Sequence, residues 1–342
     1  MSKAFSIRVQ QSGAEYPCAE DDTVLRAGLR AGLGLSYECN VGGCGTCKFE
    51  LIEGEVRNLW EEAPGLNPRD RQRGRLLGCQ CVPLSDCVIK PMIMDDRYIP
   101  LDRPRRFMGE LVQIRDLTHD IREFVFKDTQ PAAFRPGQYA LLYLPGVAGP
   151  RAYSMSNIRN DDGRWEFIIR KVPGGAGTAA LFNLKVGDRI EIDGPYGLAY
   201  LRTDTKRTVV CIGGGSGLAP MLSIARGLVA EPSMQDVKLK FFYGARGPRD
   251  LCGEAELKAL PGFGTRIEFI PALSDAEAAA AGEWTGNVGF IHELVKAHIP
   301  ADQLQECEFY TCGPPVMINA VMQMLSGELK VPAERIHYDS FV

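Results

Sequence analysis

The chain has 342 residues, 45% of them hydrophobic and 24% charged, which is the composition of an ordinary globular protein. It excludes a disordered or fibrous chain, and the length predicts two or three domains. The net charge is −4, whereas binding to the phosphate backbone of nucleic acid needs clustered positive charge. We therefore do not expect nucleic acid as a partner.

The first residues predict a β-strand, because Phe5, Ile7 and Val9 alternate with polar residues, and they lack the apolar core of a signal peptide. No apolar run reaches the roughly 20 residues that a membrane helix needs. We therefore expect a cytoplasmic protein that does not enter a membrane. A reducing cytosol keeps thiols free, so closely spaced cysteines among the eleven are candidate metal ligands rather than disulfide partners.

Four cysteines near the N-terminus have the spacing of a metal-cluster site. In YECNVGGCGTCKFE, four residues separate Cys39 from Cys44, two separate Cys44 from Cys47, and Cys79 follows after another thirty-one. This spacing is that of a plant-type [2Fe–2S] cluster. The loop also contains glycines that permit tight turns and let amide N–H groups point at the sulfurs; they are Gly42, Gly43 and Gly45.

Two alternatives remain open for these cysteines. Zinc also binds four cysteines, although zinc ribbons usually present two Cys-x2-Cys pairs and this loop has one. Cys81 is a rival to Cys79 for the fourth position, because it lies only two residues further on. Other cysteines are interpreted as buried small residues; they are Cys18, Cys87, Cys211, Cys252 and Cys307.

The chain divides into four predicted segments. Residues 1–94 form the first domain, and residues 95–106 are charged, contain two prolines and predict a linker. Residues 107–204 contain short alternating segments separated by Pro, Gly and Asp, which predict an antiparallel barrel or sandwich. In residues 205–342, apolar strands alternate with helix-like stretches, which predicts a parallel α/β sheet.

A glycine-rich loop opens the last of these segments. Residues 208–212 predict a buried strand, and Gly213, Gly215, Gly217 and Pro220 follow it before an amphipathic stretch. Strand, glycine loop and helix together predict a pyrophosphate site. The pattern is Gly-x-Gly-x-x-Pro, which departs from the usual Gly-x-Gly-x-x-Gly.

The residues after the next predicted strand leave the choice between NADH and NADPH open. This strand ends at Tyr243 and is followed by Gly244, Ala245 and Arg246, with no acidic residue to bind a ribose 2′-hydroxyl. Arg246 or Arg249 could instead meet the 2′-phosphate of NADPH.

Further motifs give the chain a family resemblance. Arg151-Ala-Tyr-Ser154 and Gly174-Gly-Ala-Gly-Thr178 precede the glycine loop, and Cys312-Gly-Pro-Pro-Val-Met317 follows it. In this order the motifs resemble those of the ferredoxin–NADP reductase superfamily. With the cysteine motif in front, the whole chain resembles the reductase components of bacterial aromatic-ring dioxygenases and multicomponent monooxygenases. The resemblance implies a multidomain α+β and α/β fold, in which a β-grasp-like ferredoxin domain precedes an antiparallel β-barrel FAD domain and a parallel α/β nucleotide-binding domain.

The resemblance also implies cofactor contacts, with NADH as the reductant. Arg151 would pair with the FAD pyrophosphate, Tyr153 would lie against the flavin, and the Ser154 hydroxyl would lie near flavin N5. The other implied contacts lie in three glycine-containing segments; they are Gly174, Gly175, Gly177, Thr178, Gly213, Gly215, Gly217, Pro220, Gly313 and Pro314.

Two more residues are implied to act near the nicotinamide. Cys312 would orient it for hydride transfer, as a positioning group rather than a nucleophile, because the four histidines are scattered and none is placed to activate it. Phe341 is a candidate for the aromatic group that covers the flavin face, and Tyr338 is a weaker one. Ordinary packing of the tail is the alternative for Phe341.

The implied activity is electron transfer. NADH donates two electrons as hydride, a [2Fe–2S] cluster accepts one, and FAD can take two and release them singly. The expected acceptor is an oxygenase or hydroxylase component, or an intermediary ferredoxin, in aromatic hydrocarbon catabolism. The alternatives are a similar reductase for a non-oxygenase partner such as a deoxysugar dehydrase, a binding or regulatory module without turnover, and a zinc-stabilised protein without a redox role.

Overall fold

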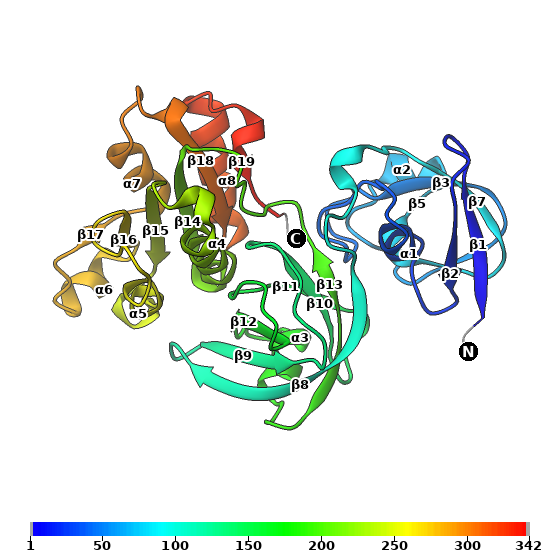
Figure 1. The fold of residues 1–342 in the computed structure, drawn as a ribbon, viewed down its shortest axis with the longest axis horizontal. Helices are drawn as coiled ribbons and strands as arrows, with labels where there is room; N and C mark the ends of the chain where they lie inside the picture. Colours follow the sequence, from blue (N-terminus) through cyan, green and yellow to red (C-terminus); the bar gives the residue numbers. More distant parts are fainter. Residues whose placement is uncertain (1–2, 340–342) are drawn as a thin grey trace.

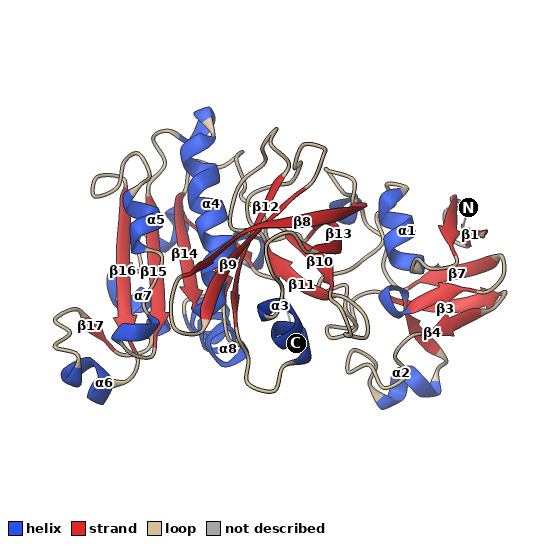
Figure 2. Ribbon diagram, turned by 90° about the horizontal axis from the view of Figure 1, so that it is seen from below, coloured by secondary structure: helices blue, strands red, loops and turns tan. Residues whose placement is uncertain are grey.

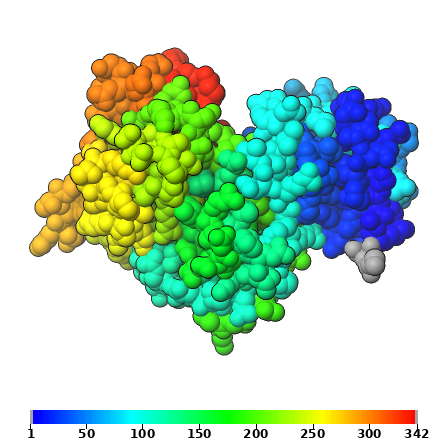
Figure 3. Space-filling model, in the orientation of Figure 1, coloured from blue at the N-terminus to red at the C-terminus, as the bar shows by residue number. Residues whose placement is uncertain are grey.

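The computed structural model describes residues 3–339 and consists of three lobes, each with its own large sheet. Figure 1 shows the N-terminal and C-terminal lobes on either side of an antiparallel barrel, and Figure 3 shows the same order on the molecular surface. Among the described residues, none of the helices combines the length and the apolar character needed to cross a lipid bilayer.

The N-terminal lobe is a five-stranded mixed sheet in the order β2-β1-β7-β3-β5, packed against helix α1. β1 and β7 run parallel, which is the β-grasp arrangement expected for this lobe. Ile7 and Val9 are buried on β1 while Arg8 between them is exposed, as the alternation predicts. Its elements are β1 (Ala4–Val9), β2 (Glu15–Ala19), α1 (Val24–Arg30), β3 (Lys48–Glu53), β4 (Val56–Asn58), α2 (Pro68–Gln72), β5 (Arg75–Leu77), η1 (Gly78–Gln80), β6 (Cys81–Pro83) and β7 (Cys87–Pro91).

The central lobe has six antiparallel strands in the order β11-β10-β13-β8-β9-β12. An isolated antiparallel bridge between Met155 and Phe167 connects the two edges of this sheet, which therefore curls into a nearly closed barrel. Large buried aromatic rings fill the interior, including Phe124 and Trp165. Its elements are β8 (Arg105–Asp116), β9 (Ile121–Lys127), β10 (Tyr139–Tyr143), β11 (Arg151–Ser154), β12 (Arg164–Arg170), α3 (Ala176–Phe182) and β13 (Arg189–Tyr196).

The C-terminal lobe is a six-stranded parallel sheet in the order β17-β16-β15-β14-β18-β19. Successive residues of β14 face two separate cores, since Val209 packs with α4 and Val210 packs with α7 and α8. Its strands are β14 (Thr208–Gly214), β15 (Leu239–Ala245), β16 (Ile267–Leu273), β17 (Asn287–Val288), β18 (Cys307–Cys312) and β19 (Ile336–His337).

Helices of the C-terminal lobe follow the parallel strands, and α4 lies between β14 and the barrel (Figure 2). They are α4 (Leu218–Ala230), α5 (Glu254–Lys258), α6 (Ala276–Ala281), α7 (Ile291–His298) and α8 (Pro315–Met322). Short 3₁₀ or π segments complete the described elements; they are η2 (Asp96–Tyr98), η3 (Gly215–Gly217), η4 (Pro232–Met234), η5 (Pro248–Asp250), η6 (Leu304–Glu306), η7 (Gln323–Glu328) and η8 (Ala333–Arg335).

The segment between the first two lobes is packed against them. Tyr98 is buried, and its ring centroid lies 6.4 Å from that of Tyr37. β8 begins at Arg105, inside the predicted 95–106 linker, because its first residues pair with the end of β13. The predicted three-part fold class is confirmed, whereas the predicted domain limits stay predictions; these are 1–94, 107–204 and 205–342.

Buried polar contacts hold the three lobes together. Ser223 of α4 donates a hydrogen bond to the Asn157 carbonyl at 2.6 Å and accepts one from the Gly137 amide at 3.1 Å, which fixes the C-terminal lobe to the barrel. On the other side, Arg30 of α1 forms an ion pair with Asp193 of β13 at 2.6 Å.

Candidate functional site

The four predicted cluster cysteines come together as two pairs. Cys39, Cys44 and Cys47 lie on the loop between α1 and β3, and Cys79 lies on η1 beside it. The Cys39 thiol donates a hydrogen bond to Cys44, which lowers the pKa of the Cys44 thiol. The Cys47 thiol donates to Cys79 in the same way, which lowers the pKa of the Cys79 thiol.

The backbone of the cluster loop is shaped around these sulfurs. The Cys44 amide donates a hydrogen bond to Cys39 Sγ at 3.3 Å. Gly42 and Gly45 have φ angles of 91° and 77°, a region in which residues with a side chain are strained. A Cβ at Gly45 would also overlap the Gly65 carbonyl oxygen, so the loop can wrap this tightly only with glycine there.

This donor set fits a two-iron cluster, because each iron of a [2Fe–2S] centre binds two cysteine sulfurs. A single tetrahedral zinc would instead gather four sulfurs about 3.8 Å apart around one point. Within residues 3–339, no three of the cysteines have their sulfur atoms all within 4.8 Å of one another, as a single zinc would require. The group of side chains that meets this criterion is His119, Asp120 and Asp250. The geometry therefore favours iron–sulfur over zinc.

The structure also separates the two rivals for the fourth cysteine position. Cys79 contacts Cys47 as described, and the Gln80 side chain donates to Cys79 Sγ at 3.7 Å. Cys81 is fully buried on β6, and burial raises the pKa of its thiol to about 12. These contacts favour Cys79. Of the cysteines interpreted as core residues, Cys252 is partly exposed and the others are buried.

The first two predicted FAD motifs meet on the barrel. The stem of Arg151 on β11 lies against Gly177, where a Cβ would stand 2.9 Å from Arg151 Cγ. The Thr178 hydroxyl accepts a hydrogen bond from the Val172 amide at 3.1 Å, which fixes the turn before α3. The structure therefore brings Arg151 and the 174–178 segment together.

The remaining residues of these motifs lie close by in the chain. Tyr153 is half-buried on β11, and burial raises the pKa of its phenol to about 12. Ser154 ends β11 and is 9% exposed. Gly174 has a φ of 72°, and Gly175 caps α3. A guanidinium, a flat ring and a hydroxyl on one strand are the groups that pyrophosphate and an isoalloxazine ring need.

The glycine loop and the Cys312 motif meet at the carboxyl edge of the parallel sheet. Gly213 pairs with Cys312 across β14 and β18. A Cβ at Gly217 would overlap the Cys312 carbonyl oxygen, and a Cβ at Gly313 would lie 3.2 Å from the Gly214 carbonyl oxygen. The strand order reverses at β14, and α/β sheets bind their ligands at the carboxyl edge beside such a reversal.

A cavity of about 600 Å³ opens beside this edge. Gly215 and Pro314 line one part of it, and residues 244–246 at the tip of β15 line another. Gly215 has a φ of 57°, and Pro220 is buried in the first turn of α4, where its missing N–H leaves no donor unsatisfied. The size and position of the cavity suit a dinucleotide.

The Cys312 thiol is protonated at neutral pH. Burial raises its pKa to about 12, and the nearby Asp339 carboxylate adds to the effect. Because the thiolate is the nucleophilic form of cysteine, the raised pKa supports a positioning role for Cys312.

Three family models match the chain in the order of the three lobes. A 2Fe-2S iron–sulfur cluster binding domain matches residues 7–84, an oxidoreductase FAD-binding domain matches residues 108–200, and an oxidoreductase NAD-binding domain matches residues 211–323. The ferredoxin–NAD(P)(+) reductase CarAd of Metapseudomonas resinovorans is 42% identical over 95% of this chain and 96% of its own. The chain belongs to the ferredoxin–NAD(P) reductases that serve as oxygenase reductase components.

Other members of the family extend this similarity. The reductase component of an alkene monooxygenase system of Xanthobacter autotrophicus is 40% identical over 96% of this chain and 98% of its own. Among solved structures, the ferredoxin reductase of carbazole 1,9a-dioxygenase superposes with a TM-score of 0.90 at 39% identity, over 99% of both chains. The Amycolatopsis cytochrome P450 reductase GcoB superposes with a TM-score of 0.82 at 30% identity, over 98% of both chains.

The three lobes are thus a ferredoxin domain, an FAD domain and an NAD domain. The reductase is an oxidoreductase that uses NADH, FAD and a [2Fe–2S] cluster. The cofactor set expected from the sequence is confirmed, and the individual residue contacts stay predictions.

The tail of the reductase holds a site residue that the sequence analysis missed. The Asp339 carboxyl is 6% exposed and accepts a hydrogen bond from the Leu198 amide at 3.4 Å. Burial raises its pKa to about 7, so it titrates near neutral pH beside Cys312. Tyr338 is 39% exposed, and the predicted Phe341 lies outside the described residues. The sequence around Asp339 is itself polar, so it carries no local signal for a buried carboxyl.

Asp250 is the residue that we expect to set the preference for NADH. It lines the cavity near the tip of β15, where the adenosine ribose of a dinucleotide binds in such sheets. Asp250 also forms an ion pair with Arg246 at 3.2 Å, so the guanidinium that could bind a 2′-phosphate is already paired with a carboxylate. Burial alone would raise the pKa of Asp120, but a hydrogen bond from Arg170 holds it below its usual range, so Asp120 stays ionised in an ion pair with Arg170, which lines the same cavity.

Asp250→Asn is expected to lower the ratio of kcat/KM for NADH over NADPH by about tenfold, or about 1.4 kcal/mol, because it removes a charge that repels the 2′-phosphate. Steady-state dye reduction with each dinucleotide measures the ratio. Glu254→Gln, on the exposed side of α5, is the control and should leave the ratio unchanged. An unchanged ratio in Asp250→Asn would contradict the assignment.

Proposed function

We propose that this reductase delivers single electrons to the oxygenase component of an aromatic or hydrocarbon oxygenase system, directly or through an intermediary ferredoxin. Relatives support an oxygenase partner, since their names assign them to alkene, xylene/toluene and phenol monooxygenases. These names favour an oxygenase over the deoxysugar dehydrase considered from the sequence. None of the eleven cysteines, all of which lie within residues 3–339, forms a disulfide, which supports a reducing, cytoplasmic location.

The proposal rests on the cluster loop reaching both the barrel and the surface. On the barrel side, the Tyr139 hydroxyl of β10 donates a hydrogen bond to the Glu38 carbonyl, next to Cys39. On the other side, Cys44 is partly exposed. The loop therefore lies between the FAD domain and any protein that docks from solvent.

The residue roles follow from this arrangement. FAD, when bound, converts a hydride into single electrons. Arg151, Tyr153 and Ser154 bind and orient it, and Cys312 orients the nicotinamide. The glycine loop and the Gly313–Pro314 turn bind the dinucleotide, and four cysteines bind the cluster; these are Cys39, Cys44, Cys47 and Cys79.

The test is an anaerobic titration of the purified protein with NADH, followed by visible absorption and electron paramagnetic resonance, and then by addition of a candidate ferredoxin or oxygenase component. Loss of the flavin and cluster bands, a reduced-cluster signal and reoxidation by the protein acceptor are expected. A flavin that bleaches without a cluster signal would leave only a flavin reductase. A colourless protein that contains zinc would overturn the proposal.

Trp60 marks the surface on which we expect the acceptor to dock. Its ring packs on Gly42 of the cluster loop, yet 45% of the residue is exposed. Leu59, which precedes Trp60, is 51% exposed, and the two residues after Trp60 are the exposed acids Glu61 and Glu62. Large aromatic side chains at the centre of a contact contribute most to protein–protein affinity.

Trp60→Ala is expected to raise the KM for the protein acceptor about tenfold, which corresponds to about 1.4 kcal/mol of docking energy. The NADH-dependent reduction of a small dye should stay unchanged. Val186→Ala, which trims a side chain that is 62% exposed on the barrel, is the control. An equal change in both variants, or an altered cluster resonance signal in Trp60→Ala, would contradict a docking role.

A further inference from the structure

Arg26 is a buried cation beside the cluster loop. It lies in the middle of α1 and is 2% exposed. A buried charge is costly unless its N–H groups are hydrogen-bonded. Arg26 meets this condition with Asn40 and Tyr143: Nε donates to Asn40 Oδ1 at 3.1 Å, Nη2 donates to the Asn40 carbonyl at 3.0 Å, and Nη1 donates to the Tyr143 hydroxyl at 2.9 Å.

The grip on Asn40 acts directly on the cluster loop. Asn40 follows Cys39, and its φ of 56° lies in the left-handed region that is uncommon for residues other than glycine. It is 1% exposed, so water cannot replace the guanidinium. By binding both the side chain and the carbonyl of Asn40, Arg26 holds the backbone next to the first cysteine in this conformation.

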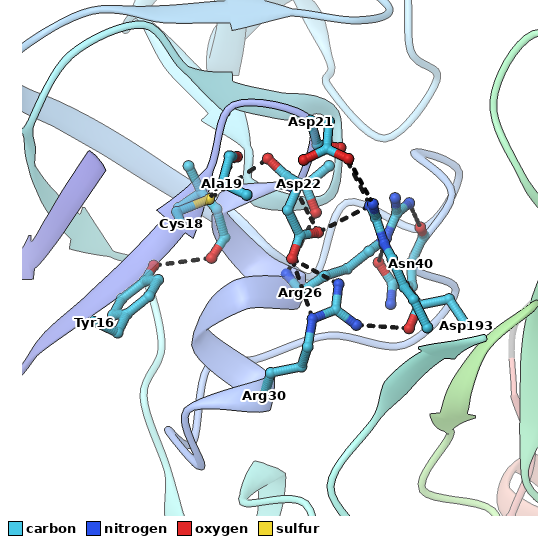
Figure 4. Close-up of polar contacts among 12 residues, drawn as sticks. Tyr16, Cys18, Ala19, Asp21, Asp22, Arg26, Arg30, Asn40 and Asp193 are labelled. Carbon is cyan, nitrogen blue, oxygen red and sulfur yellow. Dashed lines mark hydrogen bonds and ion pairs between the residues drawn. The ribbon is translucent and has the colours of Figure 1, made fainter. Parts of the chain in front are cut away.

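The third hydrogen bond reaches the FAD domain. Tyr143 ends β10 of the barrel, 117 positions away from Arg26 in the chain. One side chain therefore connects the cluster loop to the domain from which its electrons come. Figure 4 shows Arg26 beside Asn40, with Arg30, one helical turn further along α1, pairing with Asp193.

The ion pairs of this interface are made by other arginines. Arg30 pairs with Asp22 and Asp193, each at 2.6 Å, and Arg106 pairs with Asp22 at 3.2 Å. Within residues 3–339, the hydrogen-bond partners of Arg26 are an amide, a carbonyl and a phenol, all of them neutral. Its positive charge is therefore not cancelled by a direct carboxylate contact.

A buried charge without a direct carboxylate partner acts on a nearby redox centre. The charge of Arg26 interacts with Asp193 as well as with Cys79 of the cluster site. The hydrogen bond from Cys47 and this charge both lower the pKa of the Cys79 thiol. One-electron reduction of a [2Fe–2S] cluster adds a negative charge, and a cation in a low-dielectric interior stabilises the more negative state. Hydrogen bonds and net charge around the sulfurs are the protein's means of tuning such a potential. Arg26 thus fixes the backbone of the cluster loop at Asn40 and places a positive charge next to that loop.

We propose that Arg26 is a positioning residue for electron transfer, which fixes the Cys39–Asn40 backbone against the FAD domain and raises the reduction potential of the cluster through its charge. This rests on the proposed function only in assuming that the cluster is the electron outlet. The potential can be measured without turnover or a partner.

The test compares Arg26→Gln, which removes the charge, with Arg26→Lys, which keeps it. The cluster potential is measured by reductive titration with dithionite and mediators, with the resonance signal as readout. In Arg26→Gln the equilibrium constant for cluster reduction should fall at least tenfold, which is about 59 mV for one electron. Arg26→Lys should stay within threefold of the unchanged protein.

Two further variants separate charge from loosening of the interface. Tyr143→Phe keeps the charge and the grip on Asn40, and Arg30→Gln breaks the Arg30–Asp193 ion pair, so both should leave the potential within threefold. If Arg26→Gln fails to hold a cluster, Arg26→Met takes its place. An unchanged potential in the neutral variant, an equal shift in Arg26→Lys, or an equal shift in Arg30→Gln would overturn the proposal. Failure of the oxygenase to accept electrons, with the potential shifted as expected, would refute the proposed function and leave this inference standing.

Discussion

Cys44→Ser is expected to abolish electron transfer to protein acceptors while the NADH-dependent reduction of a two-electron dye stays within about twofold. The substitution removes one sulfur of the Cys39–Cys44 pair, and a hydroxyl is a poor ligand for iron that prefers thiolate. The flavin and NADH sites lie on other lobes, where the substitution changes no contact. Stopped-flow absorption with each acceptor measures the two activities, and the resonance signal of the reduced cluster should disappear.

A matched control exists in the same domain. Cys87 is buried outside the cluster loop, and its thiol donates to the carbonyls of Glu55 and Ser85, to which a serine hydroxyl can donate in its place. Cys87→Ser should therefore keep the cluster signal and both activities. Loss of dye reduction together with protein reduction in Cys44→Ser would mean that the domains do not function separably.

Gly217→Ala is expected to have the opposite pattern and to lower NADH-dependent reduction of every acceptor at least a hundredfold, about 2.7 kcal/mol or more. The added methyl would overlap the backbone carbonyl of Cys312, which cannot rotate away. Relief requires the glycine loop to separate from the Cys312 turn, and this separation disrupts the edge on which nicotinamide and pyrophosphate bind.

The flavin and cluster bands of Gly217→Ala should remain, and dithionite should still reduce both centres. Gly327→Ala is the control, since its Cβ would meet nothing closer than Gln323 Cγ at 3.8 Å. A variant that retains NADH oxidation, or one that loses its flavin as well, would show that Gly217 does not act through the dinucleotide site. Thermal unfolding of both variants separates a local effect from loss of the NAD domain.

The parts of this reductase that the sequence predicted are those with a local signal. Alternating apolar residues such as Ile7 and Val9 identify strands, and the spacing of four cysteines identifies the iron–sulfur site. The choice of Cys79 over Cys81 as the fourth ligand is not local, because it depends on which of the two thiols approaches Cys47 in space. The pairing of thiols in the structure supplies that information.

Contacts between the lobes could not be predicted in this way. Arg26 and Tyr143 lie 117 positions apart, and nothing in either segment indicates the other. The acid near the β15 tip has the same explanation: the sequence analysis looked for it directly after the strand, whereas Asp250 comes from η5 a few residues later. Asp339 joins the site only because the tail returns to Leu198.

The packed linker and the Arg30–Asp193 ion pair keep the ferredoxin domain in one pose on the barrel. A domain held in this way cannot move to its acceptor on a flexible linker. The acceptor protein has to diffuse to the ferredoxin domain, and each binding event removes one electron from cofactors that NADH has already reduced. With NADH in excess, the rate of electron transfer is then set by the frequency of encounters with the acceptor. The rate therefore rises with the acceptor concentration until acceptor binding is saturated.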